Sequence, residues 1–466
     1  EITKIPRESG HEEQIIAYLQ EFAASRNLAC KTDKAGNVLI TKDAAAGYEN
    51  VPAIVLQSHS DMVCEKNEGV EHDFAKDPIR YVIEDGWMIA PDTTLGADCG
   101  IGIAAQLAIL DSDLPCGKIE CLFTTSEETG LDGAMALQPG FFSGKVLLNL
   151  DSEEHGQLVI GCAGGKVTVC TYKYATEAAP ADYKYFDVHI NHMMGGHSGM
   201  EIGLGRGNAN QQLARFIWEM SQSCDVVVSR IDGGNLANAI PREAIATIGI
   251  PADKEAELMA YAAEFNNTIH AEFALAENPD FTFDVTAAAT PATIIDKKQS
   301  AALIATIFAT PNGVQGMSNA VPGLIETSCN LASVKMQDDK IVITVHQRSS
   351  VDSRRDEIAD RIKALYQMIG CEVIFEDAYV GWAPNPESKV LKVAESSFFD
   401  LFGEKPRVEA LHAGLECGLF LEKMPNLDMI SFGPTLKDIH SPSEKANIPS
   451  VAKYWELLTE ILKRLA

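Results

Sequence analysis

A histidine and an aspartate two residues apart follow a short apolar segment in the first part of the chain. Residues 53–56 read Ala-Ile-Val-Leu, typical of a buried strand of a parallel sheet, and lead into Gln57-Ser58-His59-Ser60-Asp61. In an extended segment, positions two apart point to the same side, so His59 and Asp61 are expected to face together. A carboxylate beside a metal-binding histidine commonly fixes its tautomer and ring orientation. The pair alone is a weak signal, because a solvated surface pair has the same pattern.

More carboxylates occur where other predicted elements end or begin. A strand predicted over 118–125 runs into Glu127-Glu128, and one predicted over 145–150 runs into Asp151. Asp98 lies in Leu95-Gly96-Ala97-Asp98-Cys99-Gly100, just before an apolar helix, and this segment lacks the lysine of a phosphate-binding loop. Carboxylates gathered at strand ends repel one another unless a cation lies among them, and a divalent ion is the simplest candidate. Four unrelated solvated loops are the alternative interpretation.

A second histidine follows a strand predicted over 428–432. His440 is followed by Ser441-Pro442-Ser443-Glu444, which fits a capping box with proline at the first helical position. His440 is therefore expected at the entry of the C-terminal helix. Ser9-Gly10-His11-Glu12 also fits a capping box, before a helix predicted over 12–28.

The elements that must hold these residues indicate an α/β fold. We expect a catalytic domain over 1–163 and 384–466, with a mixed, mainly parallel sheet sandwiched by helices. An α+β lid domain over 164–383 would interrupt it. Asn238-Ala239-Ile240-Pro241 and Asn319-Ala320-Val321-Pro322 each lie between a helical stretch and a strand, so the insertion is expected to have two similar halves. His197, between glycines in the first half, can extend out of the domain; an N-cap by Ser198 with an incidental histidine is the alternative.

Composition excludes several kinds of partner. The chain has 466 residues, enough for two or three domains, and its net charge of −28 argues against nucleic acid or an anionic membrane as a partner. No apolar run reaches the roughly 18 residues of a membrane span. The eleven cysteines follow no regular spacing, which is typical of reduced thiols in a cytoplasmic protein.

Taken together, the chemistry-bearing motifs resemble those of the M20 metallopeptidases, which hold two zinc ions. The resemblance is specific, because the order, the spacing and the strand-end placement all agree, and it extends over essentially the whole chain. Within the family, the chain is similar to the branch that cleaves Xaa-His dipeptides. The similar segments are Ile5-Pro6-Arg7-Glu8-Ser9-Gly10-His11, His412-Ala413-Gly414-Leu415-Glu416-Cys417-Gly418 and Ile439-His440-Ser441-Pro442. Cys99 departs from the family pattern, which has asparagine or aspartate there.

The resemblance implies a set of five metal ligands. One ion would be held by His59 and Asp151, the other by Glu128 and His440, and Asp98 would bridge both. Asp61 would orient His59 without binding metal. Two Zn²⁺ ions are expected, and Co²⁺ or Mn²⁺ can occupy the same ligands. The peptide bond between Asp98 and Cys99 is expected to be cis.

The resemblance also implies how the reaction proceeds. Glu127 would be the general base that takes a proton from the attacking water and passes it to the leaving amine. His197 would donate a hydrogen bond to the developing oxyanion. Arg348, predicted to follow a strand at 341–345, would bind the substrate carboxylate with its planar fork, assisted by Asn238 and the backbone of Gly414. A surface ion pair is the alternative for Arg348.

The expected function is metal-dependent hydrolysis of small peptides, specifically dipeptides such as Xaa-His. Deacylation of N-acyl amino acids or cleavage of tripeptides on the same scaffold is an alternative, and a non-catalytic peptide-binding protein is another. The protein is expected to be a monomer or a homodimer. Because a doubled lid can mimic a lid dimer, His197 is expected to act within its own chain.

Overall fold

The computed structural model describes residues 1–466 and divides into two compact units. Unit 1 comprises Glu1–Cys162, Trp382–Leu411 and Leu415–Ala466, and unit 2 comprises Ala163–Gly381 and His412–Gly414. None of the helices combines the length and the apolar character that crossing a membrane requires.

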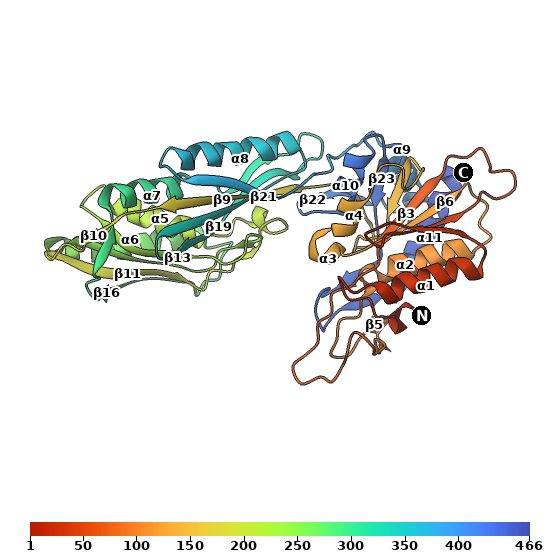
Figure 1. The fold of residues 1–466 in the computed structure, drawn as a ribbon, viewed down its shortest axis with the longest axis horizontal. Coiled ribbons are helices and arrows are strands. Elements are labelled where there is room, and N and C mark those ends of the chain that lie inside the picture. Colours follow the sequence, from red (N-terminus) through yellow and green to blue (C-terminus); the bar gives the residue numbers. More distant parts are fainter. The chain divides into compact units, whose positions relative to one another are not determined.

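Unit 1 is built on an eight-stranded sheet with the order β1-β2-β6-β3-β7-β23-β8-β22 (Figure 1). Its strands are β1 (Ala29–Thr32), β2 (Val38–Lys42), β3 (Ile54–His59), β6 (Ile119–Thr124), β7 (Val146–Asn149), β8 (Gln157–Cys162), β22 (Arg407–Leu411) and β23 (Asp428–Ser431). The pairs β6-β3, β3-β7, β7-β23 and β8-β22 are parallel and the others are antiparallel. The predicted mixed α/β fold is confirmed.

The central strands are buried on both faces, which is why their sequences are almost continuously apolar. Every residue of β3 and β6 is buried. Ile54 pairs with Ile119 at one end of these two strands, and His59 pairs with Thr124 at the other. Strand β7 lies on the other side of β3 in parallel register. The carboxyl ends of β6, β3 and β7 therefore meet at one edge of the sheet.

Helices and a small second sheet complete unit 1. The helices are η1 (Ile2–Lys4), α1 (Glu13–Ser25), α2 (Ala97–Asp111), α3 (Glu127–Gly130), α4 (Asp132–Ala136), α9 (Lys389–Phe402), α10 (Glu416–Lys423) and α11 (Ile448–Leu465). Helix α2 packs on β3 and β6, and α9 packs on β23 and α11. The second sheet has the order β24 (Leu436–Lys437), β25 (Lys445–Asn447), β5 (Trp87–Ile89) and β4 (Val82–Glu84).

Both predicted capping boxes are wrong. Helix α1 has Glu12 at its N-cap with no side-chain capping bond, and the Ser9 hydroxyl instead donates to Asp61 Oδ2 at 2.7 Å. Helix α11 begins only at Ile448, where the Asn447 side chain accepts a hydrogen bond from the Ser450 N–H. Residues 441–444 form a turn, so His440 does not lie at a helix entry. In both cases a polar side chain of the predicted capping box forms tertiary hydrogen bonds instead. Ser9 bonds to Asp61, and Glu444 bonds to backbone N–H groups between Leu95 and Asp98.

Unit 2 contains a nine-stranded sheet with the order β16-β11-β15-β13-β19-β20-β9-β21, and β18 pairs with β19. Its strands are β9 (Gly164–Lys173), β11 (Tyr183–Asn191), β13 (Val227–Gly233), β15 (Ala244–Pro251), β16 (Thr282–Ala288), β18 (Gly313–Met317), β19 (Ile325–Met336), β20 (Lys340–Ser349) and β21 (Glu372–Tyr379). The pairs β10 (Thr176–Ala178) with β17 (Thr293–Ile295) and β12 (Gly196–His197) with β14 (Ala239–Ile240) are separate. Strand β20 is longer than predicted, so Arg348 lies within it, paired with Gly165 of β9.

The helices of unit 2 are η2 (Ile202–Leu204), α5 (Ala209–Met220), η3 (Ala252–Lys254), α6 (Glu255–Glu272), α7 (Lys297–Ala309) and α8 (Asp352–Gln367). Helices α5, α7 and α8 lie along one face of the nine-stranded sheet (Figure 1), and buried side chains of α6 join the same core. From the centre outward, one half of the sheet is β13-β15-β11-β16 and the other is β19-β20-β9-β21. This order is compatible with two halves of similar build, and the internal duplication itself stays a prediction.

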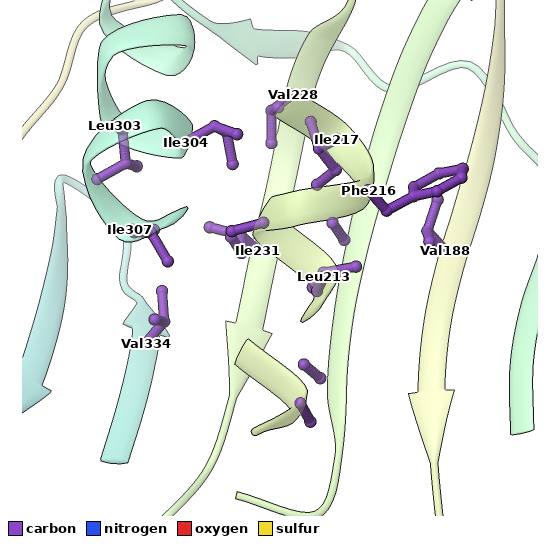
Figure 2. Close-up of a cluster of buried hydrophobic side chains, with 14 of the residues drawn as sticks. Val188, Leu213, Phe216, Ile217, Val228, Ile231, Leu303, Ile304, Ile307 and Val334 are labelled. Atoms are coloured by element: carbon purple, nitrogen blue, oxygen red, sulfur yellow. The ribbon is translucent and has the colours of Figure 1, made fainter. Parts of the chain in front are cut away.

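Helix α5 provides the centre of the unit 2 core. Figure 2 shows Leu213, Phe216 and Ile217 of this helix between α7 and the strands of the sheet. The surrounding side chains are Leu303, Ile304 and Ile307 of α7, with Val188, Val228, Ile231 and Val334 of the strands. The Phe216 ring also lies 4.8 Å from the Phe283 ring, measured between centroids, in an edge-on arrangement. The Phe216 ring also lies 5.2 Å from the ring of Phe265 in α6, so it contacts a helix as well as the sheet.

Replacing Phe216 with alanine is expected to lower the free energy of unfolding of unit 2 by about 3–5 kcal/mol, because a fully buried ring is lost and a cavity remains. Met259→Ala in α6, at a side chain that is 44% exposed, is the matched control and should change it by less than about 1 kcal/mol. Urea denaturation followed by circular dichroism measures both. Equal effects of the two substitutions would contradict the packing described above.

Candidate functional site

Three parallel strands of unit 1 carry candidate residues where they end. His59 is the last residue of β3, Glu127 and Glu128 begin the single turn α3 after β6, and Asp151 follows β7. The registers of these strands bring their carboxyl ends to the same edge. Open α/β sheets bind their ligands at this edge.

Asp98 reaches the same place from the first turn of α2. Gly96 precedes it in a left-handed conformation with φ of 67°, and Asp98 and Cys99 depart from helical backbone angles. The peptide bond between Asp98 and Cys99 is cis, which confirms the expectation from the family resemblance. The Asp98 side chain is buried, so its carboxylate is stabilised by hydrogen bonds or positive groups of the protein rather than by water.

The Asp98 carboxylate contacts two histidines through different oxygens. Its Oδ1 lies 3.0 Å from His59 Nε2, and its Oδ2 lies 3.2 Å from His440 Nε2. His59 Nε2 is also 3.2 Å from Asp151 Oδ1, and His440 Nε2 is 2.9 Å from Glu128 Oε2. The five side chains thus form two groups of three that share Asp98.

This arrangement fits two divalent metal ions. Two ligand atoms of a tetrahedral ion at 2.0–2.2 Å lie roughly 3.3–3.6 Å apart, close to the distances between these side chains. Glu128 Oε1 is buried without a hydrogen-bond partner, which leaves an acceptor for a cation. The shared carboxylate is in position to bridge two ions, and the donor atoms are imidazole nitrogens and carboxylate oxygens, which suit zinc, cobalt and manganese.

Cys99 lies beside this group without joining it. Its sulfur is within 4.8 Å of the ligand atoms of His59, Asp98 and Asp151. The Cys99 thiol donates to the Leu150 carbonyl at 3.3 Å, and burial raises its pKa well above the ordinary value. The thiol is thus held as a hydrogen-bond donor beside the imidazole and carboxylate groups.

Asp61 holds the loop that carries the two glutamates. Its Oδ1 accepts the Glu127 N–H at 3.1 Å, and its Oδ2 accepts the Glu128 N–H at 3.3 Å as well as the Ser9 hydroxyl. His59 Nδ1 lies 3.2 Å from the Asp61 carbonyl and 3.4 Å from its carboxylate. Burial opposes ionisation, but His59, Ser9 and the Glu127 N–H lower the pKa of Asp61 to about 2. The carboxylate therefore contacts both the first histidine and the glutamate loop.

Carboxylates also control the protonation of both histidines. Burial disfavours the charged form of His59, but Asp151, Asp61 and Asp98 outweigh it and raise its pKa well above the ordinary value. Hydrogen bonds to Asp98 and Glu128 raise the pKa of His440 to about 11. In the metal-free protein, both side chains are therefore in the positively charged imidazolium form at neutral pH.

Glu127 has the surroundings of an acid–base group. A carboxylate oxygen of Glu127 lies within 4.8 Å of ligand atoms of His59 and Glu128. Burial raises the pKa of Glu127 well above the ordinary value; His59 opposes this effect, whereas Asp151 and Glu416 add to it. A carboxyl group whose pKa is raised toward neutrality can both accept and return a proton near pH 7.

Sequence reasoning missed Glu416, a fully buried carboxyl next to the strands that carry this site. Its Oε2 accepts the Gln57 side-chain N–H at 2.6 Å and the Thr124 hydroxyl at 2.8 Å. Burial, with Asp151 nearby, raises the pKa of Glu416 to about 8, and His59 opposes the rise. Gln57, a polar residue inside an otherwise apolar strand, was the available signal, because a buried amide needs a partner.

Unit 2 contains a separate polar cluster around Arg348. This side chain is 4% exposed, donates from Nη1 to the Tyr379 hydroxyl at 2.9 Å, and has a buried Nε without a partner. Gly199 allows the close approach, since a Cβ there would lie 3.0 Å from the His197 ring and 3.2 Å from Arg348 Nε, and would also meet the His412 carbonyl. Tyr379 and His412 were not predicted.

The hydrogen bonds of His197 determine which of its nitrogens can donate. Its Nδ1 accepts the Gly199 N–H at 3.2 Å and the Met200 N–H at 3.0 Å, so the proton of the neutral ring is on Nε2. Burial and the charge of Arg348 lower the pKa of His197, which favours this neutral form.

The other two predicted substrate-binding residues lie in the same unit. The Asn238 carbonyl accepts the Ser198 N–H at 2.8 Å, next to His197, while the Asn238 side chain is exposed. A Cβ at Gly414 would lie 3.0 Å from the Tyr379 ring. The structure therefore brings the predicted residues of unit 2 together around Arg348 and Tyr379, and Asn238 joins through its backbone.

Comparison with known proteins gives consistent matches. The model of peptidase family M20/M25/M40 matches residues 55–464. The cytosol non-specific dipeptidase of Escherichia coli (strain K12) is 40% identical over 465 residues, which cover 100% of this chain and 96% of that protein. The structure of aminoacylhistidine dipeptidase from Vibrio alginolyticus is similar with a TM-score of 0.94 and 38% identity, over 99% of this chain and 94% of that one. Aminopeptidase PepT from Bacillus cereus, at a TM-score of 0.57 and 16% identity over 100% and 96% of the chains, shares the fold.

Metal binding at this site is expected to release protons. His59 and His440 hold protons in the metal-free protein and must be neutral to bind a metal ion. Because the raised pKa of His440 lies at about 11, the proton competes with the metal throughout pH 6–9, so the affinity should rise with pH. Calorimetric titration with Zn²⁺ in two buffers of different ionisation enthalpy should give about one to two protons released per chain at pH 7.

The His440→Gln variant is the control for this measurement and should release fewer protons. Zinc binding without any proton release at pH 7 would contradict the protonation states described for the two histidines.

Proposed function

Because the chain belongs to peptidase family M20/M25/M40, we propose that it hydrolyses dipeptides, Xaa-His dipeptides among them, at a pair of divalent metal ions. The family inferred from the sequence motifs is confirmed. The names of the Escherichia coli and Vibrio alginolyticus relatives support dipeptides as the substrate class, and the first name also supports a cytoplasmic location. The observation that carries the proposal is the Asp98 carboxylate shared between two histidine-carboxylate groups.

In this proposal the metal ions are zinc, with cobalt or manganese as substitutes. His59 and Asp151 would hold one ion, Glu128 and His440 would hold the other, and Asp98 would contribute to both. When bound, the ions would supply Lewis-acid chemistry, lowering the pKa of a water molecule and polarising the scissile carbonyl. Asp61 keeps the Glu127–Glu128 turn in place through the two N–H groups it accepts.

Glu127 is proposed to move the proton. It accepts a proton from the attacking water and returns it to the amine that leaves, so the peptide bond is replaced by a carboxylate and a free amine. Burial supports this role, because it raises the pKa of Glu127 and makes the carboxyl a stronger base than an exposed glutamate.

Arg348 is proposed to bind the C-terminal carboxylate of the dipeptide, with Asn238 and Gly414 assisting. Its guanidinium is buried and contacts a tyrosine hydroxyl rather than a carboxylate, which leaves its charge available for an anion. His197 is proposed to donate from Nε2 to the oxyanion, and the two backbone N–H groups on its Nδ1 support that tautomer.

A substrate panel tests the proposed function. The metal-depleted protein should be inactive, and restoring Zn²⁺ or Mn²⁺ should restore cleavage of Gly-His and β-Ala-His. An N-acetylated amino acid should remain intact, and the amide of Gly-His should be cleaved at least tenfold more slowly, because Arg348 has lost its carboxylate partner. Cleavage of the acetylated amino acid but of no dipeptide would indicate a deacylase. Two bound metal ions without any turnover would indicate a binding protein.

Replacing Glu127 with glutamine should reduce kcat by at least about 100-fold, because the amide has the size of the carboxyl group but cannot accept the proton. Metal content, measured by mass spectrometry, should stay at two ions per chain. Glu13→Gln, at an exposed position of α1, is the control and should leave both quantities unchanged. Turnover within tenfold of the original protein would mean that another group is the base.

A further inference from the structure

Two buried charged side chains of unit 1 lie next to the metal-ligand segments but outside the proposed ligand set. They are Arg7, which is 3% exposed, and Glu444, which is 2% exposed. Burying a charge is costly unless hydrogen bonds or opposite charges compensate it, so each must be held by specific partners. Those partners are backbone groups of the segments that carry the metal ligands.

Glu444 caps the start of helix α2 from a position far along the chain. Its Oε2 accepts the N–H groups of Leu95 and Gly96 at 2.8 and 2.9 Å. Its Oε1 accepts the N–H groups of Ala97 at 2.8 Å and Asp98 at 3.4 Å. The first N–H groups of a helix have no partner within the helix, and its dipole favours a negative charge there. Glu444 satisfies these groups at the turn that presents Asp98.

Arg7 binds the same turn by donating hydrogen bonds to backbone carbonyl groups. Its Nη1 donates to the Asp61 carbonyl at 2.6 Å and to the Ser60 carbonyl at 3.3 Å, and its Nη2 donates to the Gly96 carbonyl. Gly96 is required for this approach, because a Cβ there would lie 2.6 Å from Arg7 Nη2 and the backbone has φ of 67°. Arg7 thereby joins the residues that follow His59 to the residues that precede Asp98.

Glu444 belongs to the segment that carries His440, one of the proposed metal ligands. It follows His440 by four residues, and its N–H donates to the Ser441 carbonyl at 3.0 Å. Directly after it, β25 pairs with β5, which ties this segment to the small sheet. A displacement of the Glu444 carboxylate would therefore change the position of α2 relative to the turn of His440.

We propose that Arg7 and Glu444 are positioning residues that hold the segments of His59, Asp98 and His440 at the separation the two metal ions require. This proposal rests on the proposed metal-dependent function. Neither side chain is assigned to the ions or to the substrate. Asp98 must reach both histidines with different oxygens, so a small rotation of its turn would lengthen one contact while shortening the other.

The alternative is that Glu444 contributes only to folding, and the chain contains a matched control for that role. Glu120 is 3% exposed and accepts the N–H groups of Ser143 and Gly144, each at 2.8 Å. It lies near the start of β6, whereas the proposed metal ligands His59, Glu128 and Asp151 lie at or beyond the opposite ends of the central strands. Glu120→Gln therefore removes a comparable buried acceptor without touching a ligand segment.

The test compares Glu444→Gln with Glu120→Gln in the full chain. The glutamine at 444 keeps one acceptor oxygen but turns an amide group toward backbone N–H donors. Both variants should lower the melting temperature of the metal-free protein. Only Glu444→Gln should weaken Co²⁺ binding, by about 10- to 100-fold, and change the visible absorption spectrum of the bound Co²⁺. Its kcat for Gly-His should fall more than its KM changes.

Arg7→Lys provides a second variant, because it keeps the positive charge but cannot reach several carbonyls with one planar fork. It should change the Co²⁺ spectrum in the same way. Co²⁺ affinity and spectrum identical to those of the original protein, despite a lower melting temperature, would overturn the positioning role. An original protein that binds Co²⁺ but cleaves no dipeptide would instead overturn the proposed function and leave the Co²⁺ comparison valid.

Discussion

Mutual repulsion among buried carboxylates is the constraint on which the rest of unit 1 depends. The side chains of Asp61, Asp98, Glu127, Glu128 and Asp151 all lie at the edge where β6, β3 and β7 end. Removing several negative charges from water into one small volume is unfavourable unless positive groups surround them. His59 and His440 provide part of that compensation, since His59 contacts three of the carboxylates and His440 contacts two. Two divalent ions would provide the remainder, so in this M20 peptidase the same electrostatic demand favours both cation binding and protonation of the two histidines.

Backbone N–H groups are the second source of positive charge at this site. Asp61 accepts two of them from the Glu127–Glu128 turn, and Glu444 accepts four from the start of α2. Each of these carboxylates is thus used to hold a segment rather than to contact substrate. Because such hydrogen bonds link segments that carry different proposed metal ligands, the position of one of these side chains depends on the others. These backbone hydrogen bonds fix the segments themselves, and this keeps the Asp98 carboxylate between His59 and His440.

In unit 2 the buried charge is positive rather than negative. Arg348 is a buried cation whose partner is a tyrosine hydroxyl, and its neighbours are imidazoles. Burial, together with Arg348, lowers the pKa of His346 to about 3 and that of His412 to about 4, so these rings stay neutral near pH 7. A single permanent positive charge among neutral rings suits a singly charged anion such as the carboxylate of a peptide. The two buried polar clusters therefore differ in the sign of their charge, negative at the strand ends of unit 1 and positive around Arg348.

The sequence by itself predicted the α/β class, the positions of the central strands and, through the family resemblance, the four side chains grouped with Asp98. It could do so because apolar runs, glycine-rich turns and metal-binding residue types are local properties, and parallel strands carry the residues at their ends to a common edge. Only the tertiary structure decided where Ser9 and Glu444 form their hydrogen bonds, and both were misassigned to local helix caps. Their actual partners lie 52 residues away for Ser9 and 346 to 349 residues away for Glu444. A local pattern shows that a polar side chain can accept or donate, but which buried backbone groups still lack a partner becomes known only when distant segments have packed together.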